Sequence, residues 1–263
     1  MTLSGLPAEG RTGLTGQDRL QKKKEHVISY MQSHAGKLIV ALSGGVDSAV
    51  LLALAVEALG KDQVLAVTGG SHSVSEEDLA DAEAVATHLG AHWKILRTNE
   101  MERPGYQANE GDRCFHCRAE LFDVLGSYAG ENGYDAVAYG AILDDTGDFR
   151  PGMDAADRAG ALAPLLEGRL SKDDVRALAA QAGLPVKDKP AAACLSSRIP
   201  VGSRVTPERL AQVAEAEKNL KNLGFVQFRV RHLDDIARLE LDPEGNRLIQ
   251  DDQVRRQAVA GVK

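Results

Sequence analysis

Short apolar runs alternate with longer segments of helical periodicity along the first two thirds of the chain. The apolar runs predict buried strands, and the periodic segments predict helices. Strands and helices in alternation are typical of a doubly wound, mainly parallel sheet with helices on both faces, so we predict an α/β fold. The predicted strands span 38–42, 63–67, 92–96 and 136–139, and the predicted helices span 18–34, 47–59, 75–89, 117–128 and 171–182.

The pattern beyond about residue 200 predicts a separate small unit. Thr206 is a good N-cap and Pro207 suits the first helical turn, which indicates a helix start. The elements predicted here are a helix at 206–223, strands at 226–231 and 236–241, and a helix at 244–257. We therefore expect three parts: a flexible tail at 1–17, the α/β domain at 18–199 and a small α+β domain at 200–263.

Composition and charge narrow the function classes. The 263 residues are 43% hydrophobic and 26% charged, which is typical of a globular protein. A formal net charge of −7 argues against a protein that lives by binding nucleic acid backbones. No apolar run approaches the roughly 20 residues of a membrane span. The start of the chain lacks the pattern of a secretory signal, so we expect a cytoplasmic protein with no membrane partner.

The most informative segment follows the first predicted strand and leads directly into a helix. Gly44 and Gly45 let backbone N–H groups converge on an anion, Ser43 and Ser48 add hydroxyl donors, and the helix directs its positive end to the same place. The alternative, an ordinary strand-to-helix turn, does not require this residue pattern. The loop lacks Gly-Lys-Ser/Thr, and the chain lacks Gly-x-Gly-x-x-Gly, so γ-phosphate transfer and dinucleotide binding lose support.

This loop, Ser43-Gly-Gly-Val-Asp-Ser48, resembles the PP-loop of N-type ATP pyrophosphatases. The resemblance implies that the loop holds the pyrophosphate end of ATP while a substrate oxygen attacks the α-phosphorus. A nucleophile then displaces AMP from the adenylylated intermediate. Backbone N–H groups and Mg²⁺ would neutralise the leaving pyrophosphate, and Asp47 is the candidate metal-binding or loop-ordering residue.

The three cysteines help to predict which nucleophile attacks the adenylylated intermediate. Cys114 and Cys117 form a Cys-x-x-Cys pair at a predicted helix start, and Cys194 lies in a distant segment. An odd number of cysteines in a long chain does not suit a disulfide framework. Three thiolates from two segments suit a [4Fe–4S] cluster with one iron open to bind a hydrosulfide. The alternatives are a Cys₃His zinc site that includes His116, or cysteines with no ligand role.

Together, four features resemble the LarE-type ATP-dependent sulfur transferases from about residue 18 to 250. They are the phosphate loop, the Cys-x-x-Cys pair, Asp144-Asp145 with Arg150-Pro-Gly152, and Pro190-Ala-Ala-Ala-Cys-Leu-Ser-Ser-Arg198. The resemblance implies that ATP adenylylates the carboxylates of pyridinium-3,5-biscarboxylic acid mononucleotide and that sulfur converts them to thiocarboxylates. The product is a precursor of the nickel-pincer nucleotide. The resemblance also implies a homo-oligomer.

Two mechanisms occur in that family. In one branch a single cysteine, at the position of Cys194, gives up its own sulfur and becomes dehydroalanine. In the other, cysteines that match Cys114, Cys117 and Cys194 hold a [4Fe–4S] cluster that carries an extra sulfide from an external source. This chain has all three cysteines, so we expect the cluster, with Cys194 as a ligand.

Further residues are candidates for substrate binding. Arg198, after Ser197, is placed to meet an anionic substrate or the AMP phosphate. Arg229 and Arg231 alternate on a predicted strand, so that both project from one face where they would grip a phosphate. A solvated sheet surface is the alternative for these two. The polar Gly-Thr-Asn of relatives is replaced here by Gly140-Ala-Ile, which puts the role of the following Asp144-Asp145 in question.

Other functions share parts of this pattern. A tRNA 2-thiolation enzyme would use the same loop and cysteines, but the net acidic charge and the lack of a basic aromatic platform argue against an RNA substrate. For an ammonia-using synthetase the cysteines would be irrelevant. A nucleotide-binding regulator would keep the loop and catalyse nothing.

Overall fold

The computed structural model describes residues 15–147, 151–190 and 193–262. Residues 1–14 of the predicted tail lie outside these ranges, as do Arg150 in one of the family motifs and Ala191 and Ala192 in the other. The first helix, α1 (Gly16–His34), begins slightly earlier than predicted. Thr15 sets this start, because its hydroxyl accepts a hydrogen bond from the Asp18 backbone N–H while the Asp18 carboxylate accepts one from the Thr15 N–H.

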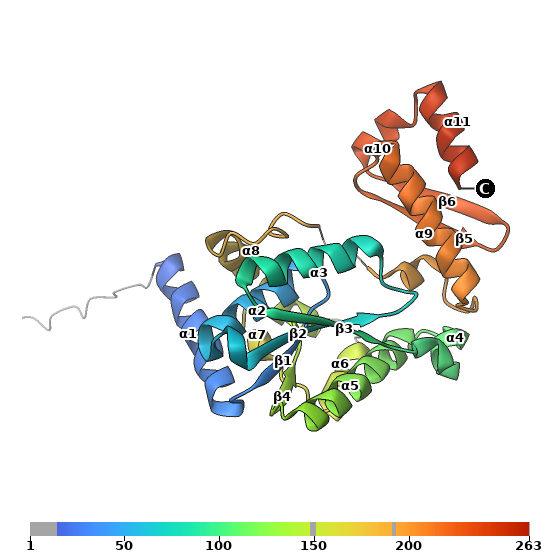
Figure 1. The fold of residues 1–263 in the computed structure, drawn as a ribbon. Coiled ribbons are helices and arrows are strands. Elements are labelled where there is room, and N and C mark those ends of the chain that lie inside the picture. The colour runs from blue at the N-terminus through green and yellow to red at the C-terminus, as the bar shows by residue number, and fades with distance from the viewer. Residues whose placement is uncertain (1–14, 148–150, 191–192, 263) are drawn as a thin grey trace, which may run out of the picture.

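Parallel strands form the central sheet of the described chain, in the order β3-β2-β1-β4 (Figure 1). They are β1 (Leu38–Ala41), β2 (Val64–Gly70), β3 (His92–Arg97) and β4 (Ala136–Ala138). These strands lie where the apolar runs predict them. The α/β fold with a mainly parallel sheet is confirmed.

Helices cover both faces of this sheet because side chains along β1 alternate between two cores. Leu38 and Val40 pack into one core with α1 and α2, whereas Ile39 packs into the other with α5. All three side chains are fully buried, which explains why the strand reads as a continuous apolar run. The main helices of this part are α2 (Val46–Leu59), α3 (Glu76–Leu89), α5 (Arg113–Asn132) and α8 (Lys172–Gln181).

Shorter helices occupy segments for which the pattern predicts no helix. They are α4 (Pro104–Ala108), α6 (Pro151–Arg158) and α7 (Pro164–Glu167). Two of them fall in the part after residue 140 that reads as a glycine- and proline-rich connector. Each begins with proline, which suits the first turn of a helix.

The strand order places a topological switch point at the carboxyl ends of β1 and β4. Strand β1 pairs with β2 on one side and with β4 on the other, so the connections that leave these strands diverge to opposite faces of the sheet. In open α/β sheets, ligands bind at this kind of switch point. The phosphate loop follows β1 and therefore lies there.

The C-terminal elements form a small α+β unit with its own apolar cluster. They are α9 (Pro207–Asn222), the antiparallel pair β5 (Phe228–Leu233) and β6 (Ile236–Leu241), α10 (Pro243–Leu248) and α11 (Asp252–Gly261). The single last helix expected at 244–257 is wrong. The helix breaks because Asp251 caps a new one by accepting hydrogen bonds from the N–H groups of Gln253 and Val254.

A second apolar cluster joins this unit to the α/β part. Tyr106 of α4 packs there with Leu195 and with Leu210 and Val213 of α9. Within the described residues, no helix is long and apolar enough to cross a membrane.

Candidate functional site

The phosphate loop is held in shape by its own serines. The Ser43 backbone N–H donates to the Ser48 hydroxyl at 3.1 Å, and that hydroxyl donates to the Gly45 carbonyl at 3.0 Å. Gly45 is the N-cap of α2, and no described side chain caps the first turn. The N–H groups of the first turn of α2 therefore have no side-chain acceptor, which suits binding of phosphate.

Two glycines allow other backbones to approach the loop closely. Gly44 has φ of +76°, and a Cβ there would lie 2.4 Å from the Asp78 carbonyl oxygen of α3. A Cβ on Gly140, after β4, would lie 2.9 Å from the Ser48 backbone nitrogen. The loop is thus packed between α3 and the end of β4, and neither glycine position has room for a side chain.

Asp47 is paired with a lysine that the sequence reasoning did not single out. Lys172 Nζ lies 2.8 and 2.9 Å from the two carboxylate oxygens of Asp47. The Lys172 backbone N–H, at the start of α8, donates to the Asp144 carboxylate at 2.9 Å. Asp47 therefore contacts a cation beside the loop. Asp144 orders the start of α8 through this hydrogen bond. It does so in a chain whose preceding segment, Gly140-Ala-Ile, differs from the Gly-Thr-Asn of relatives.

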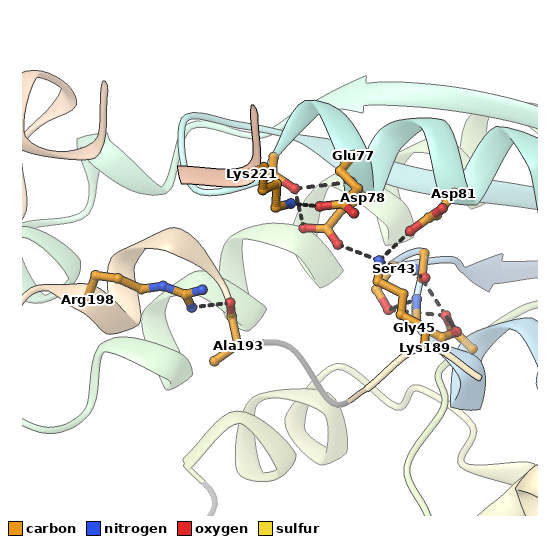
Figure 2. Close-up of polar contacts among 12 residues, drawn as sticks. Ser43, Gly45, Glu77, Asp78, Asp81, Lys189, Ala193, Arg198 and Lys221 are labelled. Carbon is orange, nitrogen blue, oxygen red and sulfur yellow. Dashed lines mark hydrogen bonds and ion pairs between the residues drawn. The ribbon is translucent and has the colours of Figure 1, made fainter. Parts of the chain in front are cut away.

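Lys189 is the second lysine at the loop. Its Nζ donates to the carboxylates of Asp78 at 2.8 Å and Asp81 at 2.6 Å, both on α3, and to the Gly44 carbonyl at 3.2 Å (Figure 2). Burial alone would lower the pKa of Lys189, but the two carboxylates outweigh it and raise the pKa above its usual value. Lys189 is therefore a fixed cation next to the loop.

The three cysteines lie on two separate parts of the fold. Cys114 and Cys117 lie in the first turns of α5, and Cys194 immediately precedes a 3₁₀ turn, Leu195–Arg198. Cys114 and Cys194 are exposed, and Cys117 is half-buried. Burial raises the pKa of the Cys117 thiol well above its usual value, and the charges of Glu100, Cys194 and Cys114 raise it further. Cys117 thus lies near both of the other cysteines.

Buried polar groups surround Cys194. The Cys194 thiol lies 3.7 Å from the Ser196 hydroxyl, which is 2.7 Å from the Tyr106 hydroxyl. Arg113 donates to the Ser196 carbonyl at 2.7 Å. Because Ser196 and Tyr106 are almost completely buried, these contacts fix the backbone next to Cys194.

The ring of His116 is directed to other partners. Its Nε2 lies 3.0 Å from the Asp112 carboxylate, and a Cβ on Gly105 would lie 2.0 Å from the same nitrogen. Among the described residues, no three His, Cys, Asp or Glu side chains lie close enough to hold a single metal ion. A donor set of three thiols spaced more widely than this still suits a cluster, because its ligands bind separate iron atoms.

A cleft of about 840 Å³ lies beside Lys189 and Arg198. It is bounded by the start of α3, by α9, by the β5–β6 pair and by Lys189, Pro190, Ala193 and Leu195. Lys221 of α9 pairs with Glu77 of α3 at its edge (Figure 2). The cleft has room for a nucleotide-sized ligand.

Arg198 is buried, with 7% of its surface exposed, and its guanidinium is engaged with protein groups. Its Nε donates to Glu217 of α9 at 2.8 Å, and Nη1 donates to the Ala193 carbonyl at 2.6 Å and the Ser197 hydroxyl at 3.0 Å. The sequence predicts an anion-binding role, whereas these contacts hold the Cys194 backbone against α9.

The two arginines of β5 differ in their surroundings. Arg229 is exposed and lines the cleft, and its side chain makes no hydrogen bond or ion pair with another described residue. Arg231 pairs with Glu240 at 2.9 Å and donates to the Ser197 carbonyl at 2.7 Å. Arg231 therefore supports the cysteine segment, and Arg229 is the arginine open to a ligand.

Comparisons with known proteins agree with this geometry. Residues 20–114 match the model of the NAD synthase family. The chain is 39% identical over 241 residues to pyridinium-3,5-bisthiocarboxylic acid mononucleotide synthase of Lactiplantibacillus plantarum, covering 90% of this chain and 87% of that protein. It is 42% identical over 225 residues to an uncharacterized protein of Synechocystis sp., covering 86% and 83%. An NH(3)-dependent NAD(+) synthetase of Pyrobaculum aerophilum is 45% identical over 69 residues, about a quarter of each chain.

The fold, the loop and the match to NAD synthase define a PP-loop nucleotide-binding domain of the class that uses ATP for adenylylation. The match to the NAD synthase family covers residues 20–114, and the likeness to the NAD(+) synthetase spans about a quarter of the chain, whereas the likeness to the bisthiocarboxylic acid synthase spans 90% of it. The chain belongs to the family of pyridinium-3,5-bisthiocarboxylic acid mononucleotide synthases.

Proposed function

We propose that this protein is an ATP-dependent sulfur transferase that converts the carboxylates of pyridinium-3,5-biscarboxylic acid mononucleotide into thiocarboxylates. The observation that carries the proposal is that one chain combines a phosphate loop with Cys114 and Cys117 of α5 and with Cys194, inside a family with a relative that is named for the bisthiocarboxylate product. A non-enzymatic nucleotide sensor would not need the cysteines at this place.

In the first step a substrate carboxylate oxygen attacks the α-phosphorus of ATP, and the bond to pyrophosphate breaks. The loop N–H groups, Ser43 and Ser48 would hold the leaving pyrophosphate, and Mg²⁺ would add positive charge there. Asp47 is the proposed metal ligand, which it would become by exchanging Lys172 for the ion. In the second step a sulfide attacks the acyl carbon, the bond to AMP breaks, and the sulfur proton is released.

The cysteines are proposed to hold the sulfur source. Cys114, Cys117 and Cys194 provide three thiolate donors, and a [4Fe–4S] cluster bound to them would present a sulfide on its fourth iron. The contacts of His116 with Asp112 disfavour the zinc alternative. We expect about four iron atoms per chain in protein purified without oxygen. Absence of iron in that protein and in reconstituted samples would contradict the cluster.

The substrate is proposed to bind in the cleft with its phosphate on Arg229. This side chain is exposed at the cleft and is not already paired, unlike Arg198 and Arg231. A guanidinium binds phosphate through two parallel hydrogen bonds. Ser197 borders the same region through its contacts with Arg198 and Arg231.

The test is direct. Purified protein is incubated with Mg²⁺, ATP, sulfide and the biscarboxylic acid mononucleotide, and AMP, pyrophosphate and thiocarboxylate are measured by mass spectrometry. We expect all three products, and we expect AMP and pyrophosphate to depend on the nucleotide substrate. Failure to form AMP with this substrate would overturn the proposal. We further propose that the protein is a cytoplasmic homo-oligomer and that a separate donor supplies its sulfide. Light scattering, which measures the molar mass in solution, tests the oligomeric state.

A further inference from the structure

Glu100 is a buried carboxylate that the proposed function does not use. It opens a 3₁₀ turn, Glu100–Glu102, between β3 and α4, and only 2% of its surface is exposed. Its Oε1 accepts a hydrogen bond from the Ser73 hydroxyl at 2.8 Å, and no lysine, arginine or histidine of the described residues pairs with it. Because water cannot stabilise a buried charge, a buried carboxylate normally has a cation or a metal as its partner. The described side chains provide no such partner for Glu100.

Hydrogen bonds through Ser73 connect Glu100 with the segment that carries Cys194. The Ser73 hydroxyl donates to Glu100, and the Ser73 carbonyl accepts the N–H of Leu195 at 3.1 Å. Ser73 is itself buried, so both hydrogen bonds are shielded from water. Glu100 is therefore held in a fixed place relative to Leu195, the residue that follows Cys194.

Glu100 also lies beside Cys117. Met101, the next residue along the chain, packs together with Cys117 against the apolar cluster of Tyr106 and Leu195. Burial raises the pKa of the Cys117 thiol, and among the charges that raise it further the charge of Glu100 has the largest effect. The carboxylate is thus part of the surroundings of the cysteines.

The chemistry of these groups points to iron as the missing partner. The three cysteines and Glu100 together provide three sulfur donors and one carboxylate, and gathering such anions without a positive charge is unfavourable. A [4Fe–4S] cluster on three cysteines has one iron atom without a thiolate. Carboxylate oxygen is a common ligand of iron in proteins. The number of donors therefore matches the number of iron atoms.

We propose that Glu100 is the fourth ligand of the cysteine site and binds the iron atom that no cysteine binds. This inference rests on the cluster in the proposed function. Hydrosulfide replaces Glu100 by ligand exchange: the iron–oxygen bond breaks, an iron–sulfur bond forms, and the carboxylate leaves with its electron pair. No oxidant or reductant is needed. Glu100 thus protects this iron atom between turnovers and releases it to the sulfur source.

The experiment compares Glu100→Gln with the control Glu102→Gln. Glutamine keeps the shape of the side chain and an acceptor for the Ser73 hydroxyl, but it lacks the charge of a carboxylate ligand. Glu102 ends the same 3₁₀ turn and is exposed. The full-length proteins are reconstituted with isotopically enriched iron and sulfide without oxygen, and excess sulfide is removed. Mössbauer spectra are then recorded before and during a titration with hydrosulfide.

Two changes are expected in Glu100→Gln and neither in Glu102→Gln. Before sulfide is added, the signal of the iron atom without a thiolate should change, because its oxygen ligand is gone. Hydrosulfide should then bind about tenfold more tightly, since it no longer has to displace a ligand. An unchanged spectrum of sulfide-free Glu100→Gln would overturn the proposal, whatever its affinity for hydrosulfide.

Iron-free protein provides a readout that needs neither cluster nor substrate. Without iron, the Glu100 carboxylate is a buried charge with no cation among the described residues, so its neutralisation should be favourable. We expect Glu100→Gln to raise the midpoint of thermal unfolding of iron-free protein by a few degrees and Glu102→Gln to leave it nearly unchanged. A lower midpoint in Glu100→Gln would show that the carboxylate serves the folded chain itself, and would contradict the proposal.

A second variant guards against a folding defect of Glu100→Gln. Ser73→Ala removes the hydroxyl that holds Glu100, while the carboxylate itself and the backbone contact with Leu195 stay in place. We expect the signal of the same iron atom to change, by less than in Glu100→Gln. An unchanged signal in Ser73→Ala, together with a misfolded Glu100→Gln, would contradict the proposal.

Failure of the ligand role and failure of the proposed function give different results. If the unmodified protein binds iron but forms no thiocarboxylate, the proposed function fails, and the Mössbauer comparison still decides the role of Glu100. If thiocarboxylate forms and the spectrum of Glu100→Gln is unchanged, only the role of Glu100 fails. Absence of iron from the unmodified protein would overturn both the cluster and its fourth ligand.

Discussion

The phosphate loop and the cysteine site are built in different ways. The loop is local: one buried strand, two glycines and one helix create it, and hydrogen bonds between Ser43, Gly45 and Ser48 shape it. The cysteine site depends on contacts between distant segments, such as those of Arg113 and Tyr106 with Ser196. The loop should therefore depend mainly on its own residues and on the close approach of α3, whereas the cysteine site should be sensitive to single long-range hydrogen bonds.

The largest effect is expected from Gly44→Ala. This residue has φ of +76°, and the added Cβ would lie 2.4 Å from the Asp78 carbonyl oxygen, so the loop must move. We expect AMP formation to fall by about 100-fold or more. Gly160→Ala is the matched control, because Gly160 also has positive φ but no atom lies near its added Cβ.

Both glycine variants should lose roughly 1–2 kcal/mol of stability from the left-handed backbone conformation. Only Gly44→Ala should also lose activity. Steady-state AMP formation measures the activity of both variants, and thermal unfolding measures their stability. Equal activity in the two variants would show that the close approach of α3 does not shape the loop.

A smaller effect is expected from Lys172→Met. Removal of the ammonium group leaves Asp47 without its partner at 2.8 Å and takes a positive charge away from the phosphate loop. We expect the KM for Mg²⁺-ATP to rise about tenfold, which corresponds to about 1.4 kcal/mol. Lys23→Met is the control, since Lys23 also pairs with α8, through Asp174, but away from the loop. An equal rise in KM in both variants would contradict a specific role for Lys172.

The smallest change in stability is expected from Arg229→Ala. Arg229 is exposed at the cleft, so its removal should raise the KM for the nucleotide substrate about tenfold and change the free energy of unfolding by less than about 0.5 kcal/mol. Arg231→Ala should instead lower stability by about 1 kcal/mol, because it breaks the contacts with Glu240 and the Ser197 carbonyl. Steady-state kinetics and urea unfolding of both variants check this contrast. An unchanged KM for the nucleotide substrate in Arg229→Ala would show that Arg229 is not part of the substrate site.

The contrast between the two regions also explains which features of the structure could be predicted from the sequence. The strand Leu38–Ala41, the loop and the start of α3 at its Ser75 cap follow from apolar pattern and local capping, and these predictions are confirmed. The roles of Lys172 and Lys189 were missed. Each lysine pairs with a carboxylate more than 100 positions away along the chain, so no local sequence pattern predicts these ion pairs.

The arginines illustrate the same limit. A period of two along a strand predicts that Arg229 and Arg231 share a face, but it cannot tell which of them is paired with Glu240 and which is open. Likewise, Arg198 reads as an anion-binding residue from its place after two serines, and only the approach of Glu217 on α9 reveals its buried partner.

The most direct test of the account is the number of thiocarboxylates formed per chain. Protein with reconstituted iron is given excess ATP, sulfide and the biscarboxylic acid mononucleotide, and the mass of the Cys194 peptide is measured after the reaction. The account predicts several products per chain and an intact Cys194, with no turnover in Cys117→Ala. At most one product per chain, with loss of one H₂S from Cys194, would contradict it and indicate a sacrificial cysteine.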